Sequence, residues 1–276
     1  MFAPVISSAR KRSLSSLIAG TAIAVAFLVL FIVFSRQNFQ LLIIVIELAS
    51  LVVSIAIFSI VWNARRNVKD LFLMAIGLSF LFTALLDALF TFSLIDSSLF
   101  RDLTFDNAVQ IWIAARYFQC ITLLVAFLLI DRTLSHEGKY DTVLLALPYA
   151  AITGILLFAI FGSHSFPSCD TLFGGYTAFK IASEFLISLL LVAGLAILVS
   201  RRKHLDPEVW DYLVLSQVLL VFGELSFAIS GSGFQLTNFL GYFCRFVSIY
   251  FIYRAIVVVG IARPFDLLYH ELQLHE

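Results

Sequence analysis

The sequence predicts an all-α integral membrane protein of eight transmembrane helices, with both termini in the cytoplasm. Of its 276 residues, 61% are hydrophobic and only 13% are charged, whereas soluble domains carry about a quarter charged residues. Long apolar stretches recur along the chain, and a helix needs about 20 such residues to cross the hydrocarbon core. The formal net charge is zero. We therefore expect a lipid bilayer as the surroundings and no nucleic acid as a partner.

The expected spans follow one another with short connections. The first, 14–34, comes after the basic run Arg10–Arg12 and is too long for a cleaved signal peptide, so we expect a retained anchor. This gives a cytoplasmic N-terminus over 1–13 and an eight-helix membrane domain over 14–262. The other seven spans are expected at 39–62, 71–95, 108–131, 142–162, 176–200, 210–230 and 236–260.

Basic residues in the connections predict the orientation. With the N-terminus inside, the inner segments hold twelve of the 18 Lys and Arg residues, and the outer loops hold only Arg36 and Arg101. The bias alternates at every turn. Trp62 and Trp210 fall at the inner boundary, where tryptophan rings act as interfacial anchors. Both termini are therefore predicted to be cytoplasmic.

Charged residues also occur inside the spans, where a charge costs several kcal/mol and is normally paired or functional. Six of them lie six to nine residues from the outer end of their span, roughly 9–14 Å deep at about 1.5 Å per residue. Lys180 lies one turn above Glu184 and would guard the outer mouth of the site. Polar residues at helical spacing, such as Thr83 and Thr91 around Asp87, place the charges on polar faces. The predicted ligand-binding residues are Glu47, Asp87, Arg116, Lys180, Glu184, Glu224 and Arg245.

These seven residues comprise four acids and three bases. The excess acid would be neutralised by a proton, a cation or the cationic group of a ligand. The alternative is that they form internal salt bridges that only fix helix packing, because interhelical polar contacts contribute roughly 0.6–2 kcal/mol. A cluster of this size costs more to desolvate than packing requires, which favours a site.

The second to fourth spans resemble the sixth to eighth. Glu47 and Glu184 lie as far apart along the chain as Asp87 and Glu224, and an arginine follows in each half. Because four intervening spans preserve orientation, this pattern predicts a 4+4 parallel repeat about an axis along the membrane normal.

Several chemistries are disfavoured by the residues present. The five histidines all lie outside the predicted spans, so none is available at membrane depth for haem or zinc. The sequence has no nucleotide-binding fingerprint and no serine or cysteine with a histidine nearby at that depth. We expect no enzyme activity, no metal and no cofactor. A pair of carboxylates could still perform acid–base chemistry, so an intramembrane enzyme stays as the third alternative.

Residues 263–276 are expected to start a cytoplasmic signalling helix. Pro264 suits the first position of a helix, and Phe265, Leu268 and Leu272 have the spacing of a coiled coil. The same spacing also fits an amphipathic helix on the inner membrane surface.

Ordered blocks of the sequence resemble the third type of membrane-associated sensor (MASE) domain, from about residue 38 to the end. The resemblance implies a prokaryotic, multi-pass sensor in the cell membrane that binds an unidentified small ligand from the outer side. It also implies signalling to a cytoplasmic histidine kinase, PAS or diguanylate cyclase module, in cis or in trans, and we expect a homodimer. The blocks are ELASLVVSIAIFSIVWNARR, LLDALFT, QIWIAARYF, FPSC…TAFKIASEFLIS, GELSFAISGSG…NFLGYFCRF and IYFIYRAIVVVGIARPFDLLYHEL.

The sequence differs from that family pattern at three positions. Histidine is typical of the family where this chain has Ile43, Phe90 and Tyr242. If those histidines bind a metal or cofactor in relatives, this chain has lost that ability. Its acids and arginines remain, so the pocket persists with altered chemistry. The leading prediction is a sensory signal-input module. The runner-up is a small-solute or ion-coupled transporter, which the predicted repeat supports but which should carry a matching polar layer in the inner half.

Overall fold

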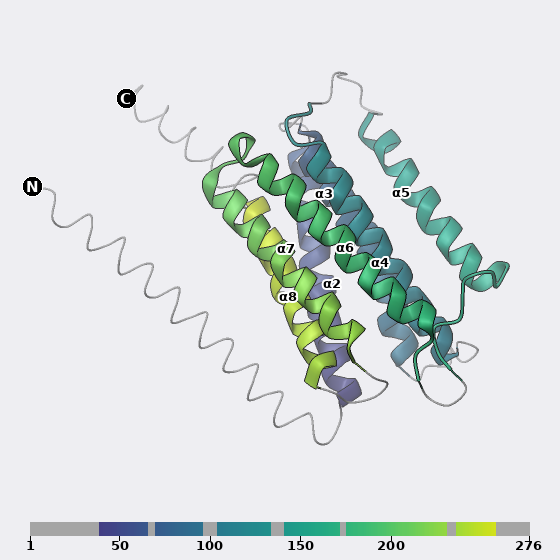
Figure 1. Ribbon diagram of the computed structural model, residues 1–276. Coiled ribbons are helices and arrows are strands. Elements are labelled where there is room, and N and C mark those ends of the chain that lie inside the picture. Colours follow the sequence, from purple (N-terminus) through teal and green to yellow (C-terminus); the bar gives the residue numbers. More distant parts are fainter. Residues whose placement is uncertain are drawn as a thin grey trace, which may run out of the picture. The chain divides into compact units, whose positions relative to one another are not determined.

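The computed structural model is all-helical over the residues that it describes, which are 39–65, 70–95, 104–133, 141–171, 175–230 and 236–257. Seven of its helices are long and apolar enough to cross a membrane, which confirms an all-α, multi-pass membrane protein (Figure 1). They are α2 (Phe39–Ala64), α3 (Leu71–Leu94), α4 (Phe105–Leu128), α5 (Asp141–Leu157) together with the π-helical turn η2 (Phe158–Gly162), α6 (Ala178–Ser200), α7 (Pro207–Ala228) and α8 (Leu236–Val257).

Each of these helices begins and ends within a few residues of its predicted span. The predicted first span over 14–34, the N-terminus over 1–13 and the tail over 263–276 lie outside the described residues. The chain divides into two units, Met1–Val45 and Ile46–Glu276. In the first unit, the described residues are the opening turns of α2. All the other described residues belong to the second unit.

Helix ends in this unit are fixed by the local sequence. Asp70 accepts a hydrogen bond from the Phe72 amide and caps α3. Thr104 forms a capping box with Asn107 at the start of α4. Asp206 caps α7, and a proline occupies the first turn of that helix. Proline lacks an amide hydrogen, which that position does not need.

The helices pack as neighbouring pairs joined through α6. Helix α7 packs along α8 and α3 along α4, while α6 contacts both α7 and α4. Helix α5 contacts α3 and α4 and lies at the edge of the unit (Figure 1). Its side chains Val143, Leu144 and Ile155 are exposed, as expected of residues that face lipid.

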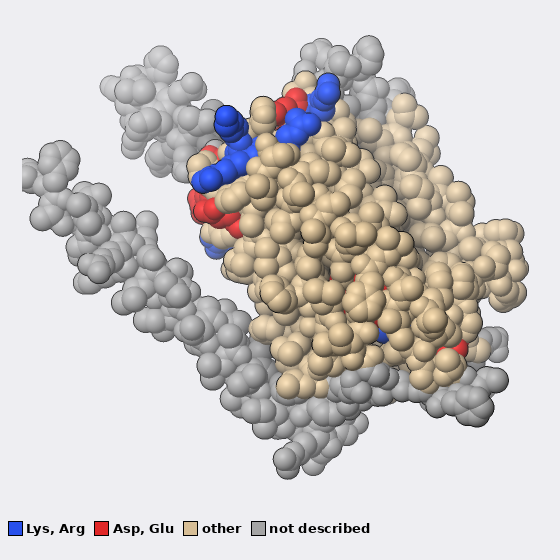
Figure 2. Space-filling view, viewed as in Figure 1, with Lys and Arg blue, Asp and Glu red and all other residues tan. Residues whose placement is uncertain are grey.

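An apolar core fills one half of the unit. Exposed basic side chains lie on the surface at the end of this same half. The core takes the C-terminal parts of α2, α4, α6 and α8 and the N-terminal parts of α3 and α7, with residues such as Ile57, Phe127 and Leu220. Figure 2 shows Lys and Arg side chains gathered at the end where α6 and α7 join, next to a broad surface with few of them. The turn there carries Arg202 and Lys203.

Candidate functional site

The seven charged residues predicted from the sequence are all buried in the half of the unit away from that apolar core. None of them is more than 3% exposed. All but Lys180, which lies in the first turn of α6, come from the interior of a helix, and a charge buried there needs partners. The partners divide the seven residues into a linked network, a separate pair and one residue by itself.

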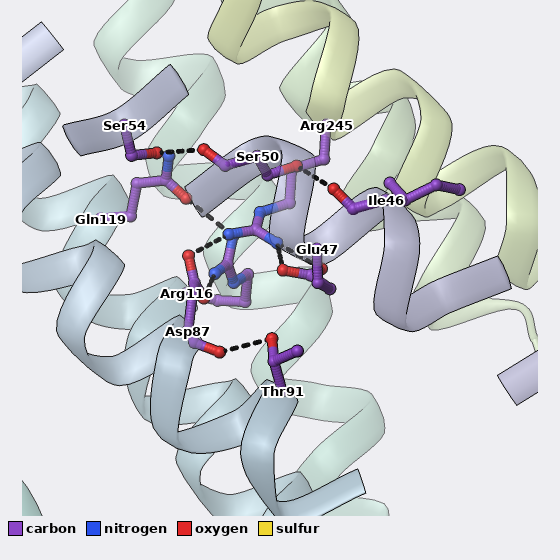
Figure 3. A network of polar contacts seen from close by, with 9 residues as sticks. All are labelled: Ile46, Glu47, Ser50, Ser54, Asp87, Thr91, Arg116, Gln119 and Arg245. Atoms are coloured by element: carbon purple, nitrogen blue, oxygen red, sulfur yellow. Dashed lines mark hydrogen bonds and ion pairs between the residues drawn. The ribbon is translucent and has the colours of Figure 1, made fainter. Parts of the chain in front are cut away.

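The linked network joins four helices through two arginines (Figure 3). Arg245 on α8 donates from Nη1 to both carboxylate oxygens of Glu47 on α2, at 2.6 and 2.8 Å. Its Nη2 donates to Asp87 on α3, and Arg116 on α4 donates to the other oxygen of Asp87. Arg116 also donates to the side-chain oxygen of Gln119 at 2.8 Å. With two guanidinium groups and two carboxylates, the network is electrically neutral.

The serine and threonine hydroxyls near this network bond to the backbone of their own helices and not to the charged groups. Ser50 and Ser54 donate to the carbonyl oxygens of Ile46 and Ser50, one turn earlier in α2, both at 2.8 Å. Thr91 donates in the same way to the carbonyl of Asp87 at 2.7 Å. Such bonds satisfy the hydroxyl within its own helix, so it does not compete for the arginines.

Hydroxyl pairs also join neighbouring helices on the core side of the charges. The hydroxyls of Ser216 on α7 and Ser248 on α8 lie 2.8 Å apart, and Ser79 on α3 bonds to Thr122 on α4. Each pair therefore fixes the spacing of two helices that carry charged residues.

The separate pair is on α6. Lys180 lies 2.8 Å from Glu184, one turn on, and its Nζ atom donates to the carbonyl of Phe227 at 3.5 Å. The same Nζ lies 3.7 Å from the centre of the Tyr176 ring. Lys180 is only 3% exposed, so the structure places it inside the cluster with several partners.

Glu224 on α7 is the acid without a partner. It takes part in no ion pair among the described residues, and its buried Oε2 atom has no hydrogen-bond partner there. Arg116, Arg245 and Lys180 act on it through their charges, but each of them already contacts another carboxylate. The seven residues hold one acid more than bases, and Glu224 is the acid that no ion pair within the described residues includes.

An aromatic cluster of Trp112, Phe227 and Tyr242 lies beside the charged residues, and Trp112 and Phe227 were not among the residues predicted from the sequence. Phe227 lies nearly one turn after Glu224 and packs edge-on against Trp112 and Tyr242, with ring centres 4.8 and 4.9 Å apart. The indole Nε1 of Trp112 is buried without a hydrogen-bond partner. Trp112 stands one turn before Arg116 on α4, and this helical spacing is the signal that could have pointed to it.

The connection between α5 and α6 is fastened to the nearby end of α4. Asp106 accepts hydrogen bonds from the backbone amides of Cys169 and Asp170 at 2.7 and 2.8 Å. Gln110 donates to the carbonyls of Phe166 and Pro167 at 3.3 and 3.2 Å. Burial, with the Asp106 carboxylate nearby, raises the pKa of the Cys169 thiol to about 12. The described part of this loop is therefore held at the start of α4 by the side chains of Asp106 and Gln110.

Comparison with known families gives one match over most of the chain. The model of the membrane-associated sensor domain MASE3 matches residues 34–264, a range that includes α2 to α8 and all seven charged residues. Comparisons with curated proteins and with solved structures give no match.

Proposed function

Because the chain belongs to the MASE3 family of membrane-associated sensor domains, we propose that its buried charged cluster receives the signal. In this proposal a small ligand enters from the outer side and binds at the cluster. Binding changes the contacts of α8, and α8 transmits the change to a cytoplasmic output module. A histidine kinase, PAS or diguanylate cyclase module fits that role, in cis or in trans, in a homodimeric assembly.

The observation that carries this proposal is the position of Arg245. One side chain on α8 is bound at the same time by Glu47 on α2 and Asp87 on α3. A ligand that alters the charge balance of these carboxylates changes how firmly α8 is bound to two other helices. A ligand shifts a conformational equilibrium only through such a difference in interaction.

The proposed orientation places the charged cluster in the outer half of the bilayer. It is supported by the basic residues at the opposite end, such as Arg202 and Lys203 in the turn between α6 and α7. In this orientation both termini are cytoplasmic, and the residues after α8 start the signalling helix.

The transporter alternative is less well supported. Alternating access requires a path to both sides, but the half of the unit away from the charges is packed with apolar side chains such as Ile57, Phe80 and Leu213. In the parts of the helices that the structure describes there, no second layer of buried charges occurs.

A reporter fusion tests the proposed function. The chain would be joined after Glu276 to a diguanylate cyclase through linkers that differ by one residue, so that all seven positions of a heptad are sampled. Cyclic di-GMP would then be measured in cells that hold equal amounts of each fusion in the membrane. We expect Arg245→Gln to change the output several-fold in at least one register. Arg254→Gln, on the same helix outside the cluster, should leave it unchanged.

Wild-type output from the Arg245→Gln fusion in every register would contradict a signalling role. Accumulation of solutes by the chain in proteoliposomes, with no change of reporter output, would favour the transporter instead.

A further inference from the structure

We propose that the ligand carries an organic ammonium group and that Glu224 is the residue that binds it. This inference rests on the proposed function, because it names the chemical class of the ligand for the same site. It follows from the charge balance of the cluster, from the side chains beside Glu224 and from the contacts that Lys180 already makes.

The cluster has a net charge of one negative unit when all its acids are ionised, so one further positive group would balance it. Arg116 and Arg245 are matched by Glu47 and Asp87, and Lys180 is matched by Glu184. Glu224 is 3% exposed and has no ion pair within the described part of the chain. A buried carboxylate without a partner is strongly unfavourable in a medium of low dielectric constant. One bound cation would complete the pairing.

The aromatic cluster that begins three residues after Glu224 on α7 favours an organic cation. Phe227 follows Glu224 on α7 and contacts the rings of Trp112 and Tyr242. Aromatic rings attract ammonium groups electrostatically, and the attraction is stronger where water is excluded. Because Phe227 stands three residues after Glu224 on α7, a cation bound at Glu224 would lie near this aromatic cluster, which suits an alkylammonium group with both a charge and a hydrocarbon part.

Lys180 shows how the site accommodates such a group. Its ammonium group lies 3.7 Å from the centre of the Tyr176 ring and 2.8 Å from Glu184, and it lies 5.9 Å from the centre of the Trp112 ring. A primary ammonium is thus already bound between a carboxylate and aromatic rings. The ligand would repeat this arrangement at Glu224.

A divalent metal fits these residues less well. Ca²⁺ requires six or more oxygen ligands and Mg²⁺ six in near-ideal geometry. Among the residues that the structure describes, no group of three or more His, Cys, Asp or Glu side chains is placed to hold a metal ion. The remaining competitor is a proton on Glu224, which the experiment below distinguishes.

Trp112 provides a built-in reporter for the test. The chain contains three tryptophans, so replacing Trp62 and Trp210 with phenylalanine leaves Trp112 as the only emitting indole. The full chain in lipid nanodiscs would be titrated with methylammonium, butylammonium and tetramethylammonium at constant ionic strength and pH. We expect a saturable change in emission with at least one of these amines.

Variants on α7 connect that response to Glu224. Glu224→Gln should weaken the apparent affinity at least tenfold, because it removes the charge that the ammonium group pairs with. Asp211→Asn, which neutralises an exposed acid on the same helix, should keep the wild-type affinity. An amine response of equal strength in Glu224→Gln would overturn the proposal.

Further titrations separate the ligand classes. An equal response to KCl or CaCl2 would show binding of an inorganic cation and overturn the organic class. A response to pH alone, with none to amines, would show that Glu224 takes a proton and would also overturn it. Either result leaves the reporter-fusion test of the proposed function intact, so the two failures are distinguishable.

A second measurement needs no variant at Glu224. Hydrophobic carbodiimides modify protonated carboxyl groups within membranes, and mass spectrometry of the wild-type chain would locate the modified residue. The effective amine should protect Glu224 from modification in a concentration-dependent manner. Modification of Glu224 at the same rate with saturating amine would contradict the proposal even where Glu224→Gln fails to fold.

Discussion

The four buried acids of the cluster have different surroundings, and a substitution should affect each of them differently. Both oxygens of Glu47 accept hydrogen bonds from Arg245, whereas Glu224 has no ion pair in the described residues. Removing one member of a buried pair leaves the other charge uncompensated, which costs more than the pair contributes. Removing an acid that has no partner has no such cost.

Glu47→Gln and Glu224→Gln should therefore differ in their consequences for stability. We expect Glu47→Gln to lower the free energy of unfolding by about 3 kcal/mol, because the buried Arg245 guanidinium loses the charged carboxylate to which its Nη1 atom donates. Glu224→Gln should not lower it. Steric trapping of the unfolded state in bicelles measures both values, and equal losses for the two variants would show that Glu224 is paired after all.

At the scale of the helices, α7 and α8 approach closely through glycines next to the charges. A Cβ atom on Gly223 would lie 3.2 Å from the carbonyl oxygen of Gly241, and one on Gly241 would lie 2.6 Å from the ring of Phe227. Phe227 itself is held between Trp112 and Tyr242. The close approach keeps Glu224 and Arg245 on adjoining helices within one cluster.

Gly241→Ala should consequently destabilise the protein by about 1–3 kcal/mol, because the buried Phe227 ring has little room to move. Gly154→Ala is a matched control on α5, where a Cβ would meet nothing within 4 Å. That change should not destabilise, since alanine favours a helix over glycine by about 1 kcal/mol. Thermal unfolding in nanodiscs tests both, and a Gly241→Ala midpoint at or above the wild-type value would contradict the packing.

The helices themselves were predictable from the sequence because length and hydropathy alone define a span. The seven described helices match the predicted ranges closely, and the charges inside them could be assigned a common depth. The neighbours of each helix could not be predicted in the same way. Faces toward lipid and faces toward protein are both apolar in a membrane, so the apolar pattern of a helix such as α5 does not reveal its partner.

Which acid pairs with which arginine also could not be predicted from the sequence. The seven residues were identified, but the sharing of Asp87 between two arginines depends on side-chain directions that spacing does not define. If the suggested repeat held in detail, Arg245 would pair with Glu224 as Arg116 pairs with Asp87. Arg245 instead pairs with Glu47 and Asp87. The repeat itself remains a prediction.

At the scale of the whole molecule, the charged cluster connects segments that are far apart along the chain. Glu47 and Arg245 stand near opposite ends of the sequence, and their contact links α2 to the last described helix. The proposed signalling depends on this link, because α8 precedes the predicted cytoplasmic tail. Isolated charges that each faced lipid would give neither a site nor a coupling.

A double-mutant cycle between Glu47 and Arg245 tests this claim most directly. The free energy of unfolding in lipid would be measured for the wild type, Glu47→Gln, Arg245→Gln and the double variant. Direct contact predicts a double variant less destabilised than the sum of the single variants, with a coupling energy of about 1 kcal/mol or more. Single-variant effects that add to within about 0.5 kcal/mol would show that the two side chains do not meet.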